Sequence, residues 1–275
     1  MRDTRDMLLV LLSSLLMLTG CSRRDILDDY PVSGVEISLD WNGVTNKLPE
    51  GVRVIFYPKN AEGRKIDTYL SVKGGKVKVP PGRYSVVVYN YDTETVQIRG
   101  EEAYETIEAF TGHCNGLGIA GTEQLVWGPD PLYVVRIDDL KIENSEEELQ
   151  LNWKPKLVVK TYSFKLKVQG LEYVSSIVGS IEGMSSCYDL GLGCGKAGDS
   201  PIYFAARGSA GEVTGSFTVF GTSEGVISRA GNAIKLTLAF VKTDNKVQKM
   251  EVDITEVIAN SESGGSGGDD DGDEP

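Results

Sequence analysis

The chain has 275 residues and a formal net charge of −12, from 28 Lys and Arg against 40 Asp and Glu. This acidic balance argues against binding of nucleic acid or anionic lipid through bulk positive charge. Glycine is abundant at 32 residues, and tyrosine outnumbers phenylalanine by 12 to 7. Together with the many valines and isoleucines, this composition favours short strands and turns over helices. We therefore expect a globular, mostly β protein.

The N-terminus reads as an export signal. Residues 8–18 form an apolar run that suits a secretory signal but is shorter than the roughly 20 residues that a membrane-spanning helix needs. The sequence Leu-Thr-Gly-Cys that follows, ending at Cys21, looks like a bacterial lipobox, in which the cysteine thiol accepts diacylglycerol. We expect residues 1–20 to be removed as a signal peptide and Cys21 to be lipidated. The alternative is an ordinary cleaved signal that a cysteine happens to follow.

The mature chain is long enough for two domains. Removing residues 1–20 from 275 leaves 255 residues, which allows two domains of about 110 to 120 residues each. Strand-like alternation returns abruptly after Trp153 and Pro155, so we place the domain boundary near residues 150 to 157. The expected parts after the signal peptide are a lipidated tether at 21–31, an N-terminal β-sandwich at 32–150, a C-terminal β-sandwich at 151–260 and a disordered acidic tail at 261–275.

The first half contains a clear alternating strand and a clear turn. Val35 to Trp41 alternates apolar and polar residues, which predicts a strand with one buried face. The Pro-Pro-Gly turn at 80–82 predicts a hairpin within 76–90, and the Val-Val-Val run after it predicts a strand buried on both faces. Residues 138–149 are acidic and suit either a turn of helix or a solvated connection. The other expected strands of this half are 52–57, 68–72, 95–98, 104–109 and 132–137.

The second half repeats the strand pattern. Five segments have strand character: 157–168, 202–206, 213–220, 233–240 and 247–254. Between the first two, residues 170–184 fit helical spacing as well as strand spacing, and we allow one short helix there.

Three cysteines remain after Cys21, namely Cys114, Cys187 and Cys194. An odd number in an oxidising compartment permits at most one internal disulfide. Cys187 and Cys194 enclose a small glycine-rich loop, so we favour that pair. Three free thiols, or a bridge that uses Cys114, are the alternatives.

No motif predicts catalysis, a metal site or a cofactor. His113 is adjacent in sequence to Cys114, but on an extended backbone the two side chains point apart, whereas thiol activation needs them adjacent in space. A G-x-G-x-x-G match at Gly193 to Gly198 runs into a strand and not into the helix that a dinucleotide site requires. The acids of the tail lack the remaining ligands of a calcium loop. We expect no enzyme activity, no metal and no cofactor.

Several phrases together resemble a known family. They are the lipobox, VEISLDW from Val35, LPEGVRVIFYP from Leu48, PPGRYSVVVYN from Pro80, and VQGLEYVSSIVGSIEGMSS from Val168. This combination resembles the fimbrillin-A-associated anchor lipoproteins of Bacteroidales and related fimbrillin-like lipoprotein domains. The resemblance implies two transthyretin-like antiparallel β-sandwich domains, a lipid anchor at the outer membrane through Cys21, fimbrillin subunits as partners, and a place as anchor or accessory subunit of a fimbria.

The resemblance also gives the first strand a role. In polymerising fimbrillins, it implies, proteolysis removes an N-terminal strand and a neighbour's strand fills the groove that is left. Here the equivalent strand, Val35 to Trp41, lies between Cys21 and the body, so a cut after it, at Lys47 or Arg53, would release the protein from the membrane. We expect this strand to be kept. The alternative function is a surface lipoprotein that binds glycan or another ligand for an outer-membrane uptake system.

Overall fold

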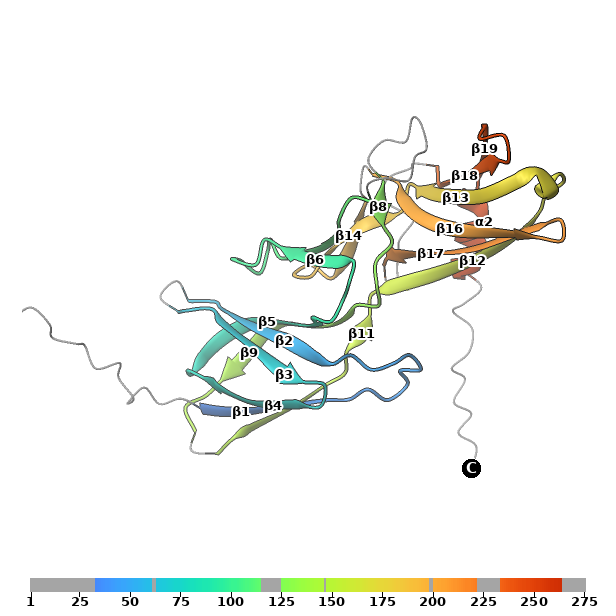
Figure 1. The fold of residues 1–275 in the computed structure, drawn as a ribbon. Helices are drawn as coiled ribbons and strands as arrows, with labels where there is room; N and C mark the ends of the chain where they lie inside the picture. Colours follow the sequence, from blue (N-terminus) through green and yellow to red (C-terminus); the bar gives the residue numbers. More distant parts are fainter. Residues whose placement is uncertain are drawn as a thin grey trace, which may run out of the picture.

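The structure is a computed structural model that describes residues 33–60, 63–114, 125–145, 147–197, 200–221 and 233–263. Most of these residues lie in three β-sheets, so the expected mostly β class is confirmed. In Figure 1 the first sheet lies at the lower left, the third at the upper right, and the small second sheet lies between them. The expected signal peptide, the tether with Cys21, and the tail from residue 264 onward lie outside the described residues.

The first sheet has eight strands in the order β10-β1-β4-β3-β2-β5-β9-β11. The bounds are β1 Ser33–Leu39, β2 Gly51–Pro58, β3 Ile66–Ser71, β4 Gly74–Val79, β5 Gly82–Asn90, β9 Tyr133–Ile142, β10 Leu149–Trp153 and β11 Lys156–Leu157. All neighbours are antiparallel except β1 and β10, which are parallel. β10 crosses residue 150, where the N-terminal domain is expected to end, and β11 lies beyond it. The division of the chain into two domains stays a prediction.

The predicted hairpin around the Pro-Pro-Gly turn is wrong. β4 pairs with β1 and β3, whereas β5 pairs with β2 and β9, so the turn joins two strands that are not neighbours. The reason is that β5 is buried from Tyr84 to Asn90 and takes a central place in the sheet, with β2 on one side and β9 on the other. The prediction that this strand is buried on both faces is confirmed.

The second sheet is built from both halves of the chain. Its order is β15-β14-β7-β6, with β6 Val96–Arg99, β7 Glu108–Thr111, β14 Ser185–Asp189 and β15 Cys194–Ala197. β7 pairs with β14, so residues about eighty positions apart in the sequence lie side by side. This pairing ties the two halves together.

The third sheet has the order β12-β17-β16-β13-β18-β19, and the short β8 also pairs with β16. The bounds are β8 Val126–Trp127, β12 Val159–Lys167, β13 Val174–Glu182, β16 Ile202–Ser209, β17 Glu212–Phe220, β18 Lys235–Lys242 and β19 Val247–Asp253. Two edges result, at β12 and at β19. A helix, α2 Thr255–Ser263, follows β19 directly and buries Ile258 in the core of this sheet.

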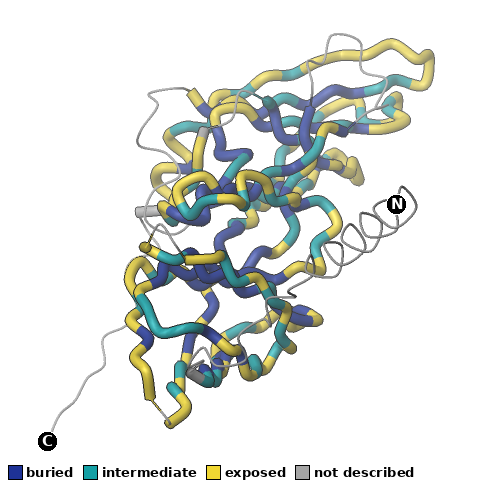
Figure 2. Tube along the Cα trace, turned by 90° about the vertical axis from the view of Figure 1, so that its left-hand side faces the viewer, coloured by how far each residue is buried: buried dark blue, intermediate teal, exposed yellow. Residues whose placement is uncertain are grey.

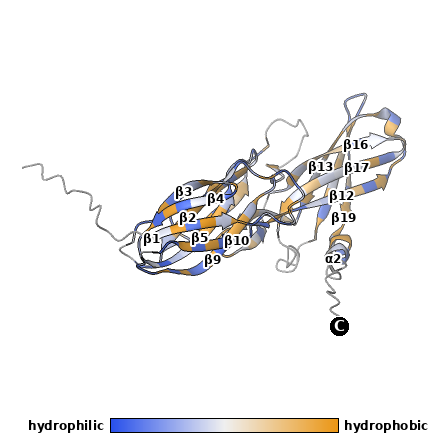
Figure 3. Cartoon of the chain, turned by 90° about the horizontal axis from the view of Figure 1, so that it is seen from below, coloured by the Kyte–Doolittle hydropathy of each residue, from blue (hydrophilic) through white to orange (hydrophobic). Residues whose placement is uncertain are grey.

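Three hydrophobic clusters hold the sheets together. One cluster is formed by side chains of the first sheet and one mainly by side chains of the third sheet. The remaining cluster lies between these sheets, where Ile55 and Val87 meet Ile107 of the β6–β7 connection and Phe220 of β17. The even-numbered residues of β2 face the first cluster and the odd-numbered residues 55 and 57 face the middle one, as the alternation of a strand requires. Figure 2 shows buried segments running through the middle of the molecule, and Figure 3 shows hydrophobic and hydrophilic residues alternating along the strands.

Three segments differ from their expected structure. The acidic segment 138–149 holds no helix in its described part, because β9 continues as a strand to Ile142. The helix allowed in 170–184 is a single 3-10 turn at Leu171–Tyr173, and the rest is β13. The tail expected to be disordered from residue 261 begins inside α2. Among the described residues, neither of the helices is long and apolar enough to cross a membrane.

Candidate functional site

The first strand is fully seated in its sheet. β1 pairs with β4 along one side, from Ser33 to Ser38, and with β10 along the other, from Val35 to Leu39. Val35 and Ile37 are almost completely buried. Burial of each such side chain contributes about 1.5 to 3 kcal/mol. The groove that removal of this strand would open is therefore closed by the chain itself.

The chain that follows β1 carries the two residues at which a cut would separate it from the body. Lys47 is exposed in the connection between β1 and β2. Arg53, in contrast, lies inside β2, which is paired with β3 on one side and β5 on the other. A protease binds its substrate as an extended chain with free backbone groups, and β2 has neither edge free at Arg53. Of the two, only Lys47 is placed where a protease can reach it.

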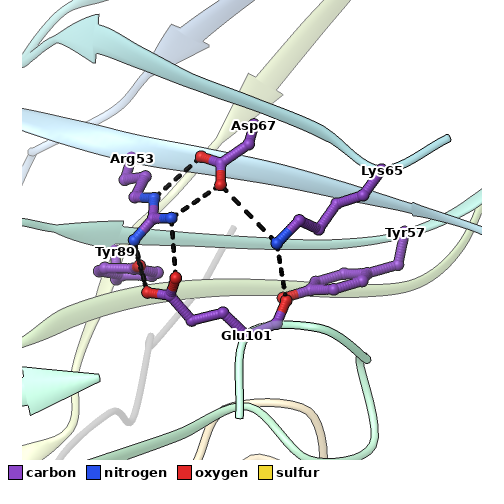
Figure 4. Close-up of polar contacts among 6 residues, drawn as sticks. All are labelled: Arg53, Tyr57, Lys65, Asp67, Tyr89 and Glu101. Carbon is purple, nitrogen blue, oxygen red and sulfur yellow. Dashed lines mark hydrogen bonds and ion pairs between the residues drawn. The ribbon is translucent and has the colours of Figure 1, made fainter. Parts of the chain in front are cut away.

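The side chain of Arg53 is also held by a polar network (Figure 4). Its guanidinium donates to both carboxylate oxygens of Asp67, at 2.9 and 2.7 Å, and to those of Glu101, at 2.5 and 3.0 Å. Tyr57 and Lys65 donate to the backbone carbonyl oxygen of Glu101, each at 3.0 Å. The network joins β2 and β3 to the loop that carries Glu101, so it fastens the region immediately after the first strand.

The network shifts the ionisation of its members. Hydrogen bonds from Arg53 lower the pKa of the Asp67 carboxyl, against the opposing effect of its burial. Burial raises the pKa of the Tyr89 hydroxyl, which accepts a 2.8 Å hydrogen bond from Arg53. Asp67 is therefore charged at neutral pH and stabilises the folded state through Arg53.

We expect Asp67→Asn to lower the free energy of unfolding by about 1.5 to 3 kcal/mol at pH 7, because it removes a charged hydrogen-bond acceptor. The folded-state pKa of Asp67 is depressed, so its contribution is present above the ordinary carboxyl pKa and is lost as the pH falls through the folded-state value. Urea unfolding at pH 7 and at about pH 3 should show the difference between wild type and variant shrinking in acid. Glu102→Gln, an exposed neighbour with no ion pair among the described residues, should change little at either pH; an equal loss in both variants would contradict the assignment.

The last strand leaves one edge of the third sheet open. β19 pairs with β18 from Val247 to Asp253, and no other described strand pairs with it. The ladder is bracketed by the hydrogen bonds Lys242 N–H to Lys246 O, 2.8 Å, and Ile254 N–H to Ile234 O, 2.9 Å. Because backbone groups alternate in direction along a strand, the even-numbered residues of β19 face β18 and the odd-numbered ones, Lys249 among them, face outward. Their N–H and C=O groups are free to pair with another strand.

The cysteines do not form a reactive centre. Cys114 is buried, Cys187 is half-buried and Cys194 is exposed, and all three are free thiols in the structure. Burial raises the pKa of the Cys114 and Cys187 thiols, which disfavours the nucleophilic thiolate. Within the β14–β15 hairpin Cys187 lies opposite Lys196 and Cys194 opposite Asp189, so the two thiols are offset by two positions. The Cys187–Cys194 disulfide stays a prediction.

The remaining sequence motifs lie apart from one another. His113 makes an isolated bridge to Val126, and the described part of the G-x-G-x-x-G match lies on the β14–β15 hairpin. Among the described residues, no group of three or more His, Cys, Asp or Glu side chains is placed to hold a metal. Sequence reasoning missed a charged cluster beside Cys187, in which Lys196 pairs with Glu108 at 3.0 Å and with the buried Asp189 at 2.9 Å. Its members come from β7, β14 and β15, so no pattern within one segment of the sequence predicts it.

Comparison with known proteins gives consistent relatives. Residues 20–205 match the model of a domain of unknown function, DUF5119. A Bacteroides ovatus protein named "Putative fimbrium anchoring subunit Fim4B" is 62% identical over 281 aligned residues, which cover 98% of this chain and 84% of that protein.

Solved structures agree. A crystal structure of a "putative adhesin" from Bacteroides ovatus is 60% identical, with a TM-score of 0.79 over 88% of this chain and 89% of that one. The fimbrial anchor protein Mfa2 from Porphyromonas gingivalis shares the fold, with a TM-score of 0.52 at 12% identity over 83% of each chain. These relatives are named as anchors and adhesins, which are structural proteins, and this confirms the resemblance to fimbrial anchor proteins.

Proposed function

The chain belongs to the DUF5119 family, and from this membership and its similarity to a fimbrium anchoring subunit we propose that it anchors a fimbria to the cell envelope. In this proposal Cys21 carries acyl chains that hold the protein on the outer membrane, and fimbrillin subunits attach to its body by strand pairing. At about 0.8 kcal/mol per buried methylene, two or three acyl chains bind a membrane far more firmly than one myristoyl group.

The observation that carries the proposal is the way β1 is paired and buried in the first sheet. This strand is the first described element after the lipidation site, and it is paired on both sides and buried in the core. If Cys21 attaches the chain to the membrane, β1 lies in the segment that connects the lipid to the body of the protein. Loss of that strand would detach the body from the lipid, so a subunit of this kind keeps its groove closed and ends a polymer at the membrane.

The open edge of β19 is the place where we expect a fimbrillin strand to pair. Lys249 is exposed, and its backbone N–H and C=O face outward from the sheet. β-strand addition at such an edge forms main-chain hydrogen bonds without a change in either fold. The prediction rests on backbone groups, so it can be tested with two variants that both lose the lysine side chain and differ only in the backbone N–H.

Lys249→Pro should abolish co-purification of the membrane-extracted protein with the fimbrillin of the same cells. Proline removes the outward N–H and is tolerated at edge positions, so no hydrogen bond to β18 is lost. Lys249→Ala removes the same side chain but keeps the N–H, and should co-purify like wild type. Equal loss in both variants would place the contact in the side chain, and retention in both would exclude this edge.

Exposed aromatic rings are the observation that supports the alternative function, a surface lipoprotein that binds glycan. Tyr69 and Tyr91, 60% and 45% exposed, pack edge to face with ring centroids 5.3 Å apart, and Trp127 is 39% exposed. Aromatic rings in such positions stack on sugars or pack against partner proteins. Quenching of Trp127 fluorescence on addition of polysaccharide, with loss of that response in Trp127→Phe, would support this function over the anchor.

A further inference from the structure

A groove of about 900 Å³ lies beside the first sheet, next to the ends of β1 and β10 and apart from the open edge of β19. Three segments form its walls: the loop 42–46 after β1, residues 133–137 of β9, and the segment 152–158 that contains β11. Tyr188 and Gly193 of the second half also line it. Because five consecutive residues of β9 line the groove, an extended chain bound in it can run alongside this strand.

One wall of the groove is a strand with free backbone groups. β11 pairs with β9 only at Tyr133 and Val134. The hydrogen bond from Val158 N–H to Leu132 O, 2.9 Å, shows that the even-numbered residues of this stretch direct their backbone groups toward β11. Arg136 is the next in the series, and no described strand pairs with it on that side. Its backbone groups face the groove.

The groove is positively charged in an otherwise acidic protein. Three of its described lining residues are cationic, Arg136, Lys154 and Lys156, and no described lining residue is acidic. Arg136 is neutralised by Asp138, 2.5 Å away. Lys154 and Lys156 are exposed and have no ion pair among the described residues, so both charges are available to a ligand.

The two lysines are spaced like alternate residues of a strand. Pro155 between them is buried while both lysines are exposed, so their side chains leave the chain on the same side. Alternate residues on an extended chain are about 6.5 to 7 Å apart. Carboxylates at alternate positions of an extended peptide have the same spacing. Leu157, 41% exposed, adds an apolar surface beside them.

We propose that this groove binds an extended segment of a partner protein with acidic side chains at alternate positions. Lys154 and Lys156 would pair with two of those carboxylates, Leu157 would pack against the intervening side chain, and the backbone at Arg136 would pair with the segment. The proposed binding does not depend on the fimbrial role, because it rests on the charged side chains and the backbone groups that line the groove.

A synthetic peptide with the sequence of residues 264–275, GGSGGDDDGDEP, is a suitable probe, since its acids at 269, 271 and 273 alternate. Fluorescence anisotropy of the labelled peptide with the full mature chain carrying Cys21→Ala should show saturable binding at low salt. Binding should weaken about tenfold by about 0.3 M salt. The same peptide with every Asp as Asn and Glu as Gln should not bind.

The double variant Lys154→Gln/Lys156→Gln should weaken binding about tenfold. Lys73→Gln/Lys78→Gln, which removes two exposed lysines outside the groove, is the matched control for net charge and should bind like wild type. Equal weakening by the two double variants would overturn the proposal, as would absence of binding. Binding that appears only after deletion of residues 264–275 would also overturn it, because the chain's own tail would then be the occupant.

Discussion

Replacing Cys21 by Ala is expected to move the protein from the membrane fraction to the soluble fraction and to leave assembled fimbriae detached from the cell. In the lipobox reading, the thiol of Cys21 is the atom that accepts the diacylglycerol. The measurement is an immunoblot of membrane, soluble and medium fractions with antibodies to the protein and to the fimbrillin.

Cys114→Ala is the matched control, because it removes a buried thiol of the body and leaves the lipobox intact. It should stay in the membrane fraction with its fimbriae attached. If Cys21→Ala released the protein while fimbriae remained on the cell, the lipidation would stand and the anchoring role would fail. If neither the protein nor the fimbriae were released, a lipid on Cys21 would not be what holds the protein on the membrane, and the lipobox reading would fail.

Ile37→Ala is expected to lower the free energy of unfolding by about 2 to 5 kcal/mol, the range for removing a buried isoleucine from a packed core. Ile37 is 1% exposed and lies at the centre of β1, where it contributes to the cluster inside the first sheet. The loss should be measured by urea unfolding of the soluble Cys21→Ala protein.

Ser38→Ala in the neighbouring position tests whether the core face of β1 carries this stability. Ser38 is exposed, and its hydroxyl makes only a 3.3 Å hydrogen bond to the carbonyl oxygen of Leu151 and another to Asn152. Its loss should be under about 1 kcal/mol. Similar effects from Ile37→Ala and Ser38→Ala would show that β1 is held only loosely in the first sheet. The proposal that β1 permanently fills its own position in that sheet would then lose its support.

The sequence predicted most strands because their apolar residues alternate. β18, with Leu236, Leu238 and Phe240 on the core side, and β5, with its Val-Val-Val run, were both recognisable from pattern alone. Pairing was not. The Pro-Pro-Gly turn suggests a hairpin because local turns usually join neighbours, whereas here the burial of β5 on both faces decided its place in the sheet.

Contacts between distant segments explain the other differences. β14 pairs with β7 across the two halves, and a period of two along either strand says nothing about which partner it will choose. The helix α2 escaped prediction because its sequence, TEVIANSES, is polar, and its beginning is set by Asp253, which accepts hydrogen bonds from the backbone and hydroxyl of Thr255. The groove lined by Lys154 and Lys156 takes its other walls from residues 42–46 and 133–137, so only the fold brings it together.

We infer that the first strand stays between the lipid and the body of the protein. The most direct measurement is mass spectrometry of the N-terminus of the protein extracted from membranes of fimbriated cells. The account predicts a chain that begins at a lipidated Cys21 and still contains Val35 to Trp41. A chain that begins at Val54, or anywhere else beyond Trp41, would contradict it.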